Sequence, residues 1–375
     1  MKILHLSGSK HHWSGNEQQL VDLIDNLPQH ETQSFIFCYE GSAIEQYAKK
    51  HDIVCFSQKR RSIYSPLLAV ALKRCVEENQ IDVIHAHTSN FLTVYMIADL
   101  LFHLHRPTVF SRKGFSEKSG FFSHCKYNYR GIDSIICVSN AVKENMKLFL
   151  SHENFYKLHT IYDGLSIKRC SEQRKTIDLR KKYGLHGQLL LGNIANHVNA
   201  KDLPTLIRTI SYLKNELKQD NFHLIQIGKK TALTPFLEKM AAENGVSDLI
   251  TFTDAIEDAD FLLNQFDLLV MSSQSEGLPL VVYAAFYYRV PVVTTDAGGI
   301  PEIVHHKTTG LLSRISDSKT LAKNMAWLME DLDLREKIRQ QAHNLFIEQF
   351  TAAKCAESTW NLYSEIIQNK KSCLQ

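Results

Sequence analysis

The sequence has no long hydrophobic run, and none of its apolar stretches approaches the roughly 18 residues that a membrane-spanning helix requires. The N-terminal segment contains one lysine and a short apolar stretch, without the long apolar core and cleavage site of a signal peptide. We therefore expect this segment to be a first β-strand and the protein to be cytoplasmic.

Paired cysteine motifs are also absent. The eight cysteines are scattered, and no two of them form a C-x-x-C pair. Some lie in apolar surroundings, as Cys137 does between Ile136 and Val138. Buried, reduced thiols are the favoured interpretation, and neither a disulfide nor a cysteine-based metal site is expected.

The chain carries little excess charge, because 43 Lys and Arg residues face 40 Asp and Glu residues, which leaves a net charge of +3. Together with the lack of a recognition motif, this balance predicts that nucleic acid is not a partner. The 375 residues, 44% of them apolar, are typical of an ordinary globular protein long enough for two domains.

Apolar strand-like runs alternate with helical patterns along the whole chain. This alternation predicts an α/β protein with doubly wound parallel sheets. The first series of expected strands is 2–7, 33–39, 53–56, 82–87, 107–111, 132–138 and 159–162, with helices at 17–27, 44–50, 66–79, up to about 105, and 140–149. The second series of strands is 189–194, 223–227, 249–252, 266–271 and 291–295, with helices at 203–217, 234–244, 259–265 and from 318 to about 368.

Between the two series lies a stretch rich in Lys, Arg, Ser and Gln, residues 166–182, which we interpret as a linker. The expected domains are 1–165 and 166–354, both Rossmann-like. The final helix, about 355–375, is a candidate to pack back on the first domain.

The stretch around Glu276 has the features of a ligand-binding loop. A buried strand is followed by small polar residues, by Glu276 and Gly277, and by a helix whose first turn holds Pro279. The unpaired N–H groups and the dipole at such a helix start favour an anion such as phosphate. The pattern therefore predicts that a nucleotide diphosphate binds here and that Glu276 holds the attached sugar.

The segment from Glu276 to Leu280, followed by residues 295–304 and 309–312, resembles the donor-binding segment of glycosyltransferase family 4. Residues 14–17 stand where the family has a glycine-rich loop, 82–87 match a family strand, and 161–164 match its interdomain turn. Gly192 and Lys201 match the phosphate-binding region. The resemblance covers nearly the whole chain and implies the GT-B fold, in which two Rossmann-like domains face each other across a cleft.

Members of this family transfer a sugar from a nucleotide sugar with retention of the anomeric configuration, and many build lipopolysaccharide or capsule. The resemblance therefore implies a hexosyltransferase of cell-envelope glycan synthesis that acts on a lipid-linked or lipopolysaccharide acceptor. A UDP-sugar is the favoured donor, and the inner face of the cell membrane is the expected place of action.

The resemblance also implies roles for particular residues. Glu276 contacts hydroxyls of the donor sugar, and Lys201 neutralises charge on the departing phosphate, because fixed cations and donors stabilise the negative charge that develops there. The backbone N–H groups near Leu280 and Val281 face the diphosphate. The expected donor-binding residues are Gly15, Asn196, Lys201, Glu276, Gly277, Leu278, Pro279, Leu280 and Val281.

The sequence departs from the family pattern at three positions. A second glutamate, assigned by the resemblance to the ribose, is replaced by Ala284, and an arginine five residues before the lysine is replaced by Asn196. A histidine of the first domain is replaced by Lys113, which remains a candidate to contact the phosphate or the acceptor. We expect Glu276, Lys201 and Lys113 to form the catalytic set.

No convincing metal-binding motif is present, because the acids at 257–260 fit the positive end of a helix dipole. In retaining enzymes of this type the leaving phosphate can itself take the acceptor proton, so no nucleophilic side chain is needed. We expect no cofactor and no essential metal.

The acceptor side is expected in the first domain. His87 and Arg112 are candidates beside Lys113, and His85 shares a strand face with His87, although a structural histidine is an equally good interpretation of His87. Two clusters mix basic and aromatic residues: Lys59, Arg60, Arg61 and Tyr64, and then Arg112, Lys113, Phe115, Lys118, Phe121, Phe122, Lys126, Tyr127, Tyr129 and Arg130. They suit an anionic membrane surface, or else a solvated loop over core aromatics.

Two other functions stay open. The replacements at Ala284 and Asn196 suggest a weakened sugar-nucleotide-binding protein or a supporting subunit. A GT-B epimerase shares the architecture, although its catalytic acids are not matched here.

Overall fold

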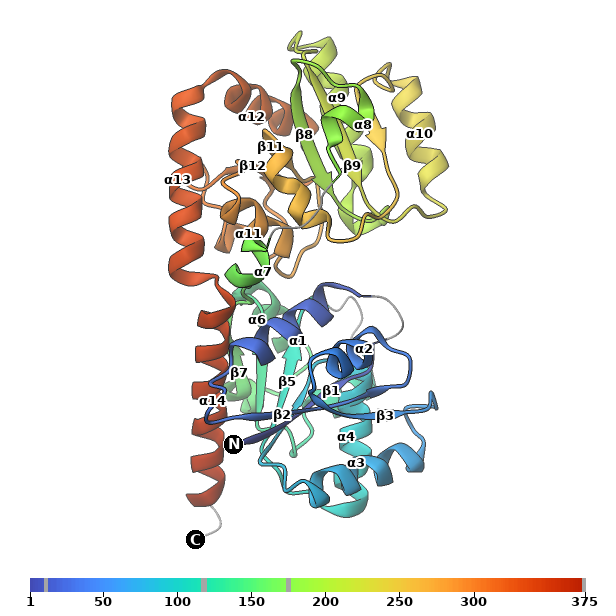
Figure 1. Ribbon diagram of the computed structural model, residues 1–375, viewed down its shortest axis with the longest axis vertical. Coiled ribbons are helices and arrows are strands. Elements are labelled where there is room, and N and C mark those ends of the chain that lie inside the picture. The colour runs from blue at the N-terminus through green and yellow to red at the C-terminus, as the bar shows by residue number, and fades with distance from the viewer. Residues whose placement is uncertain (10–12, 116–119, 173–176, 373–375) are drawn as a thin grey trace. The chain divides into compact units, whose positions relative to one another are not determined.

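The computed structural model describes residues 1–9, 13–115, 120–172 and 177–372. Their contacts form two units (Figure 1), the first made of Met1–Gly164 with the C-terminal helix α14 (Ala352–Ser372) and the second of Leu165–Thr351. The predictions on Lys118, 173–176 and 373–375 lie outside the described residues.

The first unit is built around a seven-stranded parallel sheet with the order β3-β2-β1-β4-β5-β6-β7. Its strands are β1 (Lys2–Ser7), β2 (Gln33–Tyr39), β3 (Val54–Gln58), β4 (Val83–Ala86), β5 (Thr108–Arg112), β6 (Ser134–Cys137) and β7 (Leu158–Thr160). Its helices are α1 (Gly15–Asn26), α2 (Ala43–Lys50), α3 (Pro66–Glu78), α4 (Ser89–Phe102), α5 (Phe121–Tyr127), α6 (Asn140–Lys147), the 3₁₀ segment η1 (His152–Lys157) and α14. Strands β4 and β6 are buried along their whole length, as is typical of a sheet covered on both faces.

Helix α14 returns to the first sheet and helps to cover one of its faces (Figure 1). Tyr363 and Ile366 of this helix share a buried apolar cluster with Ile3, Val83 and Val109 of three neighbouring strands. The last helix therefore completes the core of the first unit.

The second unit contains a six-stranded parallel sheet with the order β10-β9-β8-β11-β12-β13. Its strands are β8 (Leu189–Ile194), β9 (Phe222–Ile227), β10 (Ile250–Phe252), β11 (Leu268–Val270), β12 (Val292–Thr295) and β13 (Leu311–Ser313). Its α-helices are α7 (Ile167–Ser171), α8 (Leu179–Tyr183), α9 (Leu203–Asn215), α10 (Thr234–Glu243), α11 (Leu280–Tyr287), α12 (Ser318–Glu330) and α13 (Leu332–Gln349). Four short 3₁₀ turns occur in the described chain; besides η1 they are η2 (Asn199–Lys201), η3 (Ala259–Gln265) and η4 (Ile300–Glu302).

The predicted class, two doubly wound parallel α/β sheets, is confirmed. The prediction of a linker at 166–182 is wrong for its described part, because this part forms α7 and α8 of the second unit. Cys170 and Leu179 are buried there, and Tyr288 donates a hydrogen bond to the carbonyl of Cys170. Polar composition concealed two short helices that each bury few apolar side chains.

No helix among the described residues is long and apolar enough to cross a membrane.

Parallel sheets present their ligand-binding loops at the carboxyl ends of the strands. In the first unit these loops follow β4 and β5 and carry His87 and Lys113. In the second unit they follow β8 and β11 and carry Lys201 and Glu276.

Candidate active site

The loop that carries Glu276 joins β11 to α11. Pro279 is the N-cap of α11, in extended conformation, and the helix proper begins at Leu280. The first N–H groups of a helix have no partner within the helix, so this helix start offers donors to an anion. Gly277, Leu278 and Pro279 connect these donors directly to Glu276.

Glu276 is buried, and its carboxylate is held from two sides. Lys201 Nζ lies 2.5 Å from Oε1, and the hydroxyl of Ser273 donates to the same oxygen at 2.7 Å. The backbone carbonyl of Glu276 accepts from the N–H of Gly299 at 3.0 Å. The glutamate is therefore fixed in position before any ligand arrives.

The backbone around Lys201 is tied to the same loop. Ser272 Oγ donates to the carbonyls of Lys201 and Asp202 at 3.0 and 2.9 Å. The N–H of Gln274 donates to the carbonyl of Ala200 at 2.8 Å. Asp202 has a left-handed backbone (φ 43°), which is uncommon for a residue other than glycine. It caps α9 by accepting from the N–H of Thr205, and it also accepts from the Gln274 side chain.

The structure brings Lys201 together with Glu276 and the helix start, as the resemblance implied, although the two residues lie 75 positions apart in the sequence. Asn196 is exposed, and its Oδ1 accepts from the N–H of Lys229 at 3.0 Å. Ala284 is buried within α11. Gly15 lies in the first unit, at the exposed first turn of α1.

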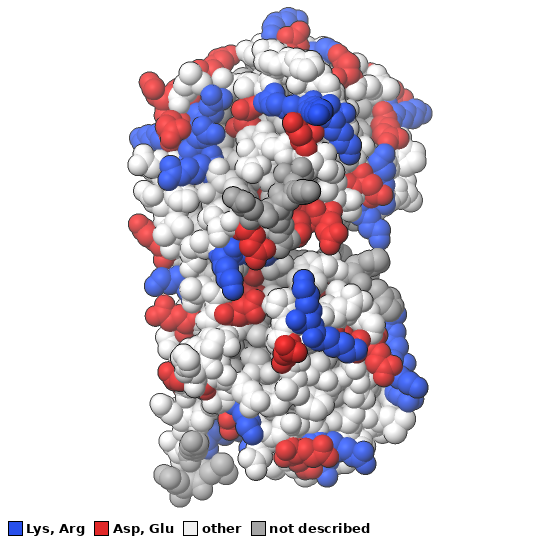
Figure 2. Space-filling model, in the orientation of Figure 1, with Lys and Arg blue, Asp and Glu red and all other residues white. Residues whose placement is uncertain are grey.

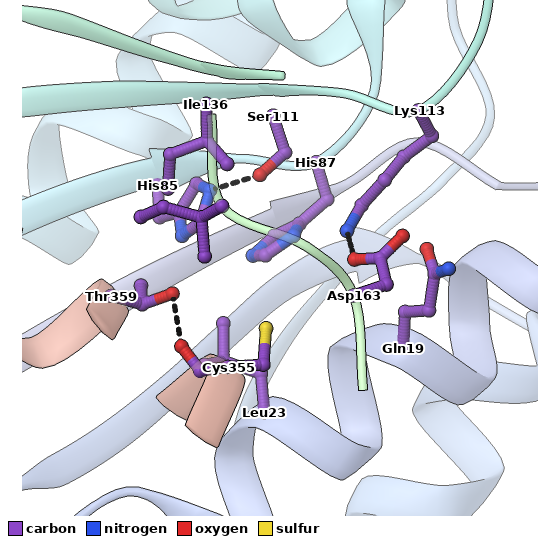
Figure 3. Close-up of a pocket in the computed structure, with 11 residues that line it drawn as sticks. Gln19, Leu23, His85, His87, Ser111, Lys113, Ile136, Asp163, Cys355 and Thr359 are labelled. Atoms are coloured by element: carbon purple, nitrogen blue, oxygen red, sulfur yellow. Dashed lines mark hydrogen bonds and ion pairs between the residues drawn. The ribbon is translucent and has the colours of Figure 1, made fainter. Parts of the chain in front are cut away.

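In the first unit a polar cavity of about 10 Å³ lies at the carboxyl ends of β4 and β5 (Figure 3). Its polar lining includes Gln19, His85, His87, Ser111, Lys113 and Asp163, and α14 contributes Cys355 and Thr359. Two of the predicted acceptor-side residues, His87 and Lys113, therefore line one cavity. Arg112 instead turns its Nε to the carbonyl of Gly114 at 2.7 Å.

Lys113 forms an ion pair with Asp163, a fully buried carboxylate from the turn after β7 (Figure 3). Burial raises the pKa of Asp163, and the charge of Lys113 acts in the opposite direction. The side chain of Gln19 lies beside the same carboxylate, and its hydrogen bond also acts to lower the pKa of Asp163. Lys113, which stands where the family has a histidine, is thus already paired with the acid Asp163.

Three histidines meet beside this cavity. His5 and His85 are register partners on β1 and β4, and His87 follows on the same face. His5 Nδ1 lies 3.0 Å from His87 Nε2, and the nitrogens of His85 contact Tyr363 Oη at 2.5 Å and Ser111 Oγ at 2.7 Å. Burial lowers the pKa of His5 to about 3 and the pKa values of His85 and His87 well below their usual range, so all three imidazoles are neutral.

The basic and aromatic clusters divide between core and surface. Tyr127 is buried, and Lys126 donates to the hydroxyl of Ser89 at 2.6 Å. Phe121 and Phe122, by contrast, are 79% and 86% exposed. Over the face of the described chain seen in Figure 2, positive and negative side chains are interspersed without a broad basic surface.

Sequence reasoning missed the supporting residues of both sites. Ser273 belongs to a polar stretch that was noticed only as loop composition, and Asp202 was not singled out from the sequence. Asp163 was assigned to an interdomain turn, and its pairing with Lys113 joins residues 50 positions apart. His5 gave no signal of its own, because one histidine in an apolar strand resembles many structural histidines.

Comparisons with known proteins agree with this architecture. The profile of glycosyltransferase family 4 matches residues 13–169, and that of glycosyl transferases group 1 matches residues 175–345. An Anabaena protein, HepE, solved in complex with UDP and glucose, superposes with a TM-score of 0.84 over 97% of this chain and 100% of its own, at 21% sequence identity. At that identity the likeness shows the fold.

Two curated relatives are N-acetyl-alpha-D-glucosaminyl L-malate synthase of Bacillus anthracis, 23% identical over 64% of this chain, and the O-antigen biosynthesis glycosyltransferase WclY of Escherichia coli, 22% identical over 58%. The matched part spans 61% and 60% of these relatives, less than two thirds of their length. The two family profiles, in contrast, cover both units of the chain in order. On this evidence residues 13–169 belong to glycosyltransferase family 4 and residues 175–345 to glycosyl transferases group 1, and the chain has the GT-B fold.

Proposed function

We propose that this protein transfers a sugar, with retention of configuration, from a nucleotide sugar to a lipid-linked or lipopolysaccharide acceptor in cell-envelope glycan synthesis. The observation that carries the proposal is the buried Glu276 carboxylate, held by Lys201 and Ser273 directly before the start of α11. A UDP-sugar is the proposed donor, supported by the UDP and glucose bound to the similarly folded HepE. The lipopolysaccharide acceptor is supported by the O-antigen role in the name of the E. coli relative.

In the proposed reaction the diphosphate lies at the start of α11, where backbone N–H groups and the helix dipole stabilise it. Glu276 accepts hydrogen bonds from donor-sugar hydroxyls. The Lys201 ammonium, already 2.5 Å from Glu276, then lies close to both sugar and phosphate. It stabilises negative charge as the glycosyl–phosphate bond breaks.

The acceptor hydroxyl attacks the same face of the sugar, and its proton passes to the leaving phosphate oxygen. One glycosidic bond forms as one glycosyl–phosphate bond breaks, without a covalent enzyme intermediate. No metal or cofactor is assigned a role in this proposed step.

The test is a panel of UDP-, GDP- and ADP-sugars, assayed for nucleotide release and for acceptor extension by mass spectrometry. We expect turnover with one donor class. Glu276→Gln and Lys201→Ala should each lower kcat about 10²-fold or more, because each removes a group that stabilises developing charge or holds the sugar.

Ser275→Ala is the matched control, because Ser275 is exposed in the same loop and should retain full activity. Circular dichroism of each variant checks folding. Unchanged turnover in Glu276→Gln would refute the site, and a product still linked to the nucleotide would indicate an epimerase.

A second candidate is a sugar-nucleotide-binding protein without turnover, favoured by Ala284 in place of a glutamate and by the exposed Asn196 in place of an arginine. Calorimetry measures the binding of UDP and the transfer assay measures turnover, and together the two measurements separate the functions. Binding of UDP without transfer to any acceptor, in the presence of cell-envelope lipid extracts, would support the binding protein.

We also propose that the first unit meets the membrane through helix α5. Phe121 and Phe122 are exposed at its start, and the cationic side chain of Arg130 is exposed just beyond its end, a combination that suits an anionic bilayer.

Flotation with phosphatidylglycerol vesicles should show binding that Phe121→Ser/Phe122→Ser weakens about tenfold or more, because two large apolar side chains no longer insert. Leu332→Ser, at an apolar position 61% exposed in the second unit, is the control and should bind as wild type. Equal binding by all variants would refute this surface.

A further inference from the structure

We propose that His5, His85 and His87 form a binding site for a divalent transition-metal ion, with zinc as the favoured ion, in the first unit. The site goes beyond the proposed transfer reaction, since none of its residues belongs to the two loops that carry Glu276 and Lys201. Among the described residues, these histidines are the one group of three candidate ligands whose ligand atoms all lie within 4.8 Å of one another.

The strand geometry places the three rings together. His85 lies on β4 and His87 directly follows its last residue, Ala86, so both point to one face of the sheet, and His5 lies directly across from His85 on β1. Two ligands on one strand and a third on its neighbour hold an ion without help from a flexible loop. All three side chains are buried, and one ring nitrogen of each lies within 4.8 Å of those of the other two.

The distances suit ligation by imidazole. Zinc–nitrogen bonds of about 2.0–2.1 Å in tetrahedral geometry separate two ligand nitrogens by about 3.3 Å. His5 Nδ1 and His87 Nε2 lie 3.0 Å apart, so a small adjustment admits an ion between them in place of their mutual hydrogen bond. His5 Nε2 is buried without a protein partner among the described residues, so hydrogen bonding at that nitrogen does not fix the ring in its present rotamer.

The surroundings supply an outer shell. Metal-bound histidines usually keep a hydrogen bond on their second ring nitrogen, which orients the ring. His85 contacts Tyr363 Oη through Nδ1 and Ser111 Oγ through Nε2, so ligation through Nε2 replaces the Ser111 bond and retains the Tyr363 bond. Tyr363 comes from α14, and an ion at this site therefore links β1 and β4 to the C-terminal helix.

The neighbouring cavity offers a fourth position. Its volume of about 10 Å³ suits roughly one water molecule, and His85, His87 and Ser111 are on its wall. Asp163, on the same wall, carries a buried carboxylate that can accept a hydrogen bond from a metal-bound water. Three neutral imidazoles and a water are a ligand set that zinc accepts.

The first test is made on the wild-type protein, purified without a histidine tag and stripped with a chelator. Equilibration with buffered zinc should give one zinc per chain by elemental analysis, and cobalt should give the visible absorption of a tetrahedral site. The thermal midpoint should rise with zinc and fall again with chelator, since the ion binds only the folded site. Absence of stoichiometric zinc in the wild type would overturn the proposal, leaving the histidines as a hydrogen-bonded core cluster.

Variants locate the ion. His5→Phe and His85→Gln should lose the stoichiometric zinc, and Tyr363→Phe should weaken binding roughly 10-fold to 100-fold by removing an outer-shell partner. His103→Gln/His105→Gln is the control, because these exposed histidines stack at 5.7 Å and are the kind of surface pair that binds metal adventitiously. Loss of zinc in this control with retention in His5→Phe would overturn the site.

Discussion

Glu276 shows how much of the proposed chemistry depends on single hydrogen bonds. Its Oε1 accepts from Lys201 and from Ser273, and the carbonyl of Ser273 in turn accepts from Thr295 Oγ1 at 2.5 Å. The serine therefore connects the glutamate to strand β12. Ser273 touches no substrate in this arrangement, but it positions Glu276, which is proposed to contact the donor sugar.

Ser273→Ala removes that support and leaves Glu276 held by Lys201 alone. We expect kcat to fall about tenfold, because a hydrogen bond to a charged group contributes about 1.5–3 kcal/mol. Ser273→Thr retains the hydroxyl and should recover part of the rate. Steady-state kinetics of wild type, Ser273→Ala and Ser273→Thr measures this effect on kcat. Equal kcat values would show that Ser273 has no positioning role.

His223 gives the protein a pH-dependent stability in the second unit. Its Nε2 contacts Thr251 Oγ1 at 2.8 Å, and burial lowers its pKa below the usual 6.5. Below about pH 6.5 the unfolded chain binds a proton that the folded chain does not bind, so the free energy of unfolding falls as the pH falls.

His223→Gln should therefore lose less stability than wild type between pH 7.5 and 5.5. The difference in the free energy of unfolding between the two proteins changes by at most about 1.4 kcal/mol per pH unit. Exposure of this half-buried position to solvent makes that change smaller. Urea unfolding at several pH values measures it, with the exposed His30→Gln as control. Identical pH profiles for wild type and His223→Gln would contradict the assignment.

At the scale of elements, long apolar strands were predictable and short helices were not. Strands β1 and β2 were predicted to the residue, because burial of most of their positions on both faces of the sheet produces mainly apolar runs. Helix α5 was missed because two of its apolar residues, Phe121 and Phe122, are exposed and leave no amphipathic pattern. Helices α7 and α8 were hidden by their basic residues.

The local geometry of the candidate donor site was predictable where a sequence motif encodes it, while the roles of its residues stay predictions. Glu276 and the start of α11 lie within one short segment, so spacing and resemblance located them. The Lys113–Asp163 pair and the meeting of His5 with His87 depend on strand order, which brings residues 50 and 82 positions apart into contact. No local pattern encodes such pairings.

Helix α14 is predicted to stabilise the first unit selectively. Tyr363 is fully buried, and Tyr363→Ala should cost about 3–5 kcal/mol through lost contacts and the cavity left behind. Hydrogen exchange should rise in β1, β4 and β5 while β8 and β9 keep their protection. Asn361→Ala, an exposed change on the same helix, should leave both units unaffected. Equal loosening of both sheets in Tyr363→Ala would contradict this view.

At the scale of the whole molecule, each unit has its own sheet and its own buried apolar cluster. The proposed donor-binding residues are concentrated in the second unit, with Gly15 as the exception. The histidine cluster lies entirely in the first. Binding of nucleotide and binding of metal should therefore act on different parts of the chain.

Hydrogen exchange with saturating UDP tests this separation. Protection should increase in residues 196–203 and 271–281, while β1 and β4 exchange as before. Zinc should produce the reverse pattern, with added protection around β1, β4 and α14. UDP-induced protection centred on β1 and β4 would show that the donor site has been assigned to the wrong unit.

The return of α14 to the first sheet has a consequence for synthesis on the ribosome. Residues 165–351 form an uninterrupted unit, which can complete its core as soon as it has emerged. The first unit, although translated earlier, lacks the apolar face of α14 until the last helix leaves the exit tunnel. Until then Ile3, Val83 and Val109 lack part of their apolar cover, so we expect the first unit, although translated earlier, to complete its core after the second.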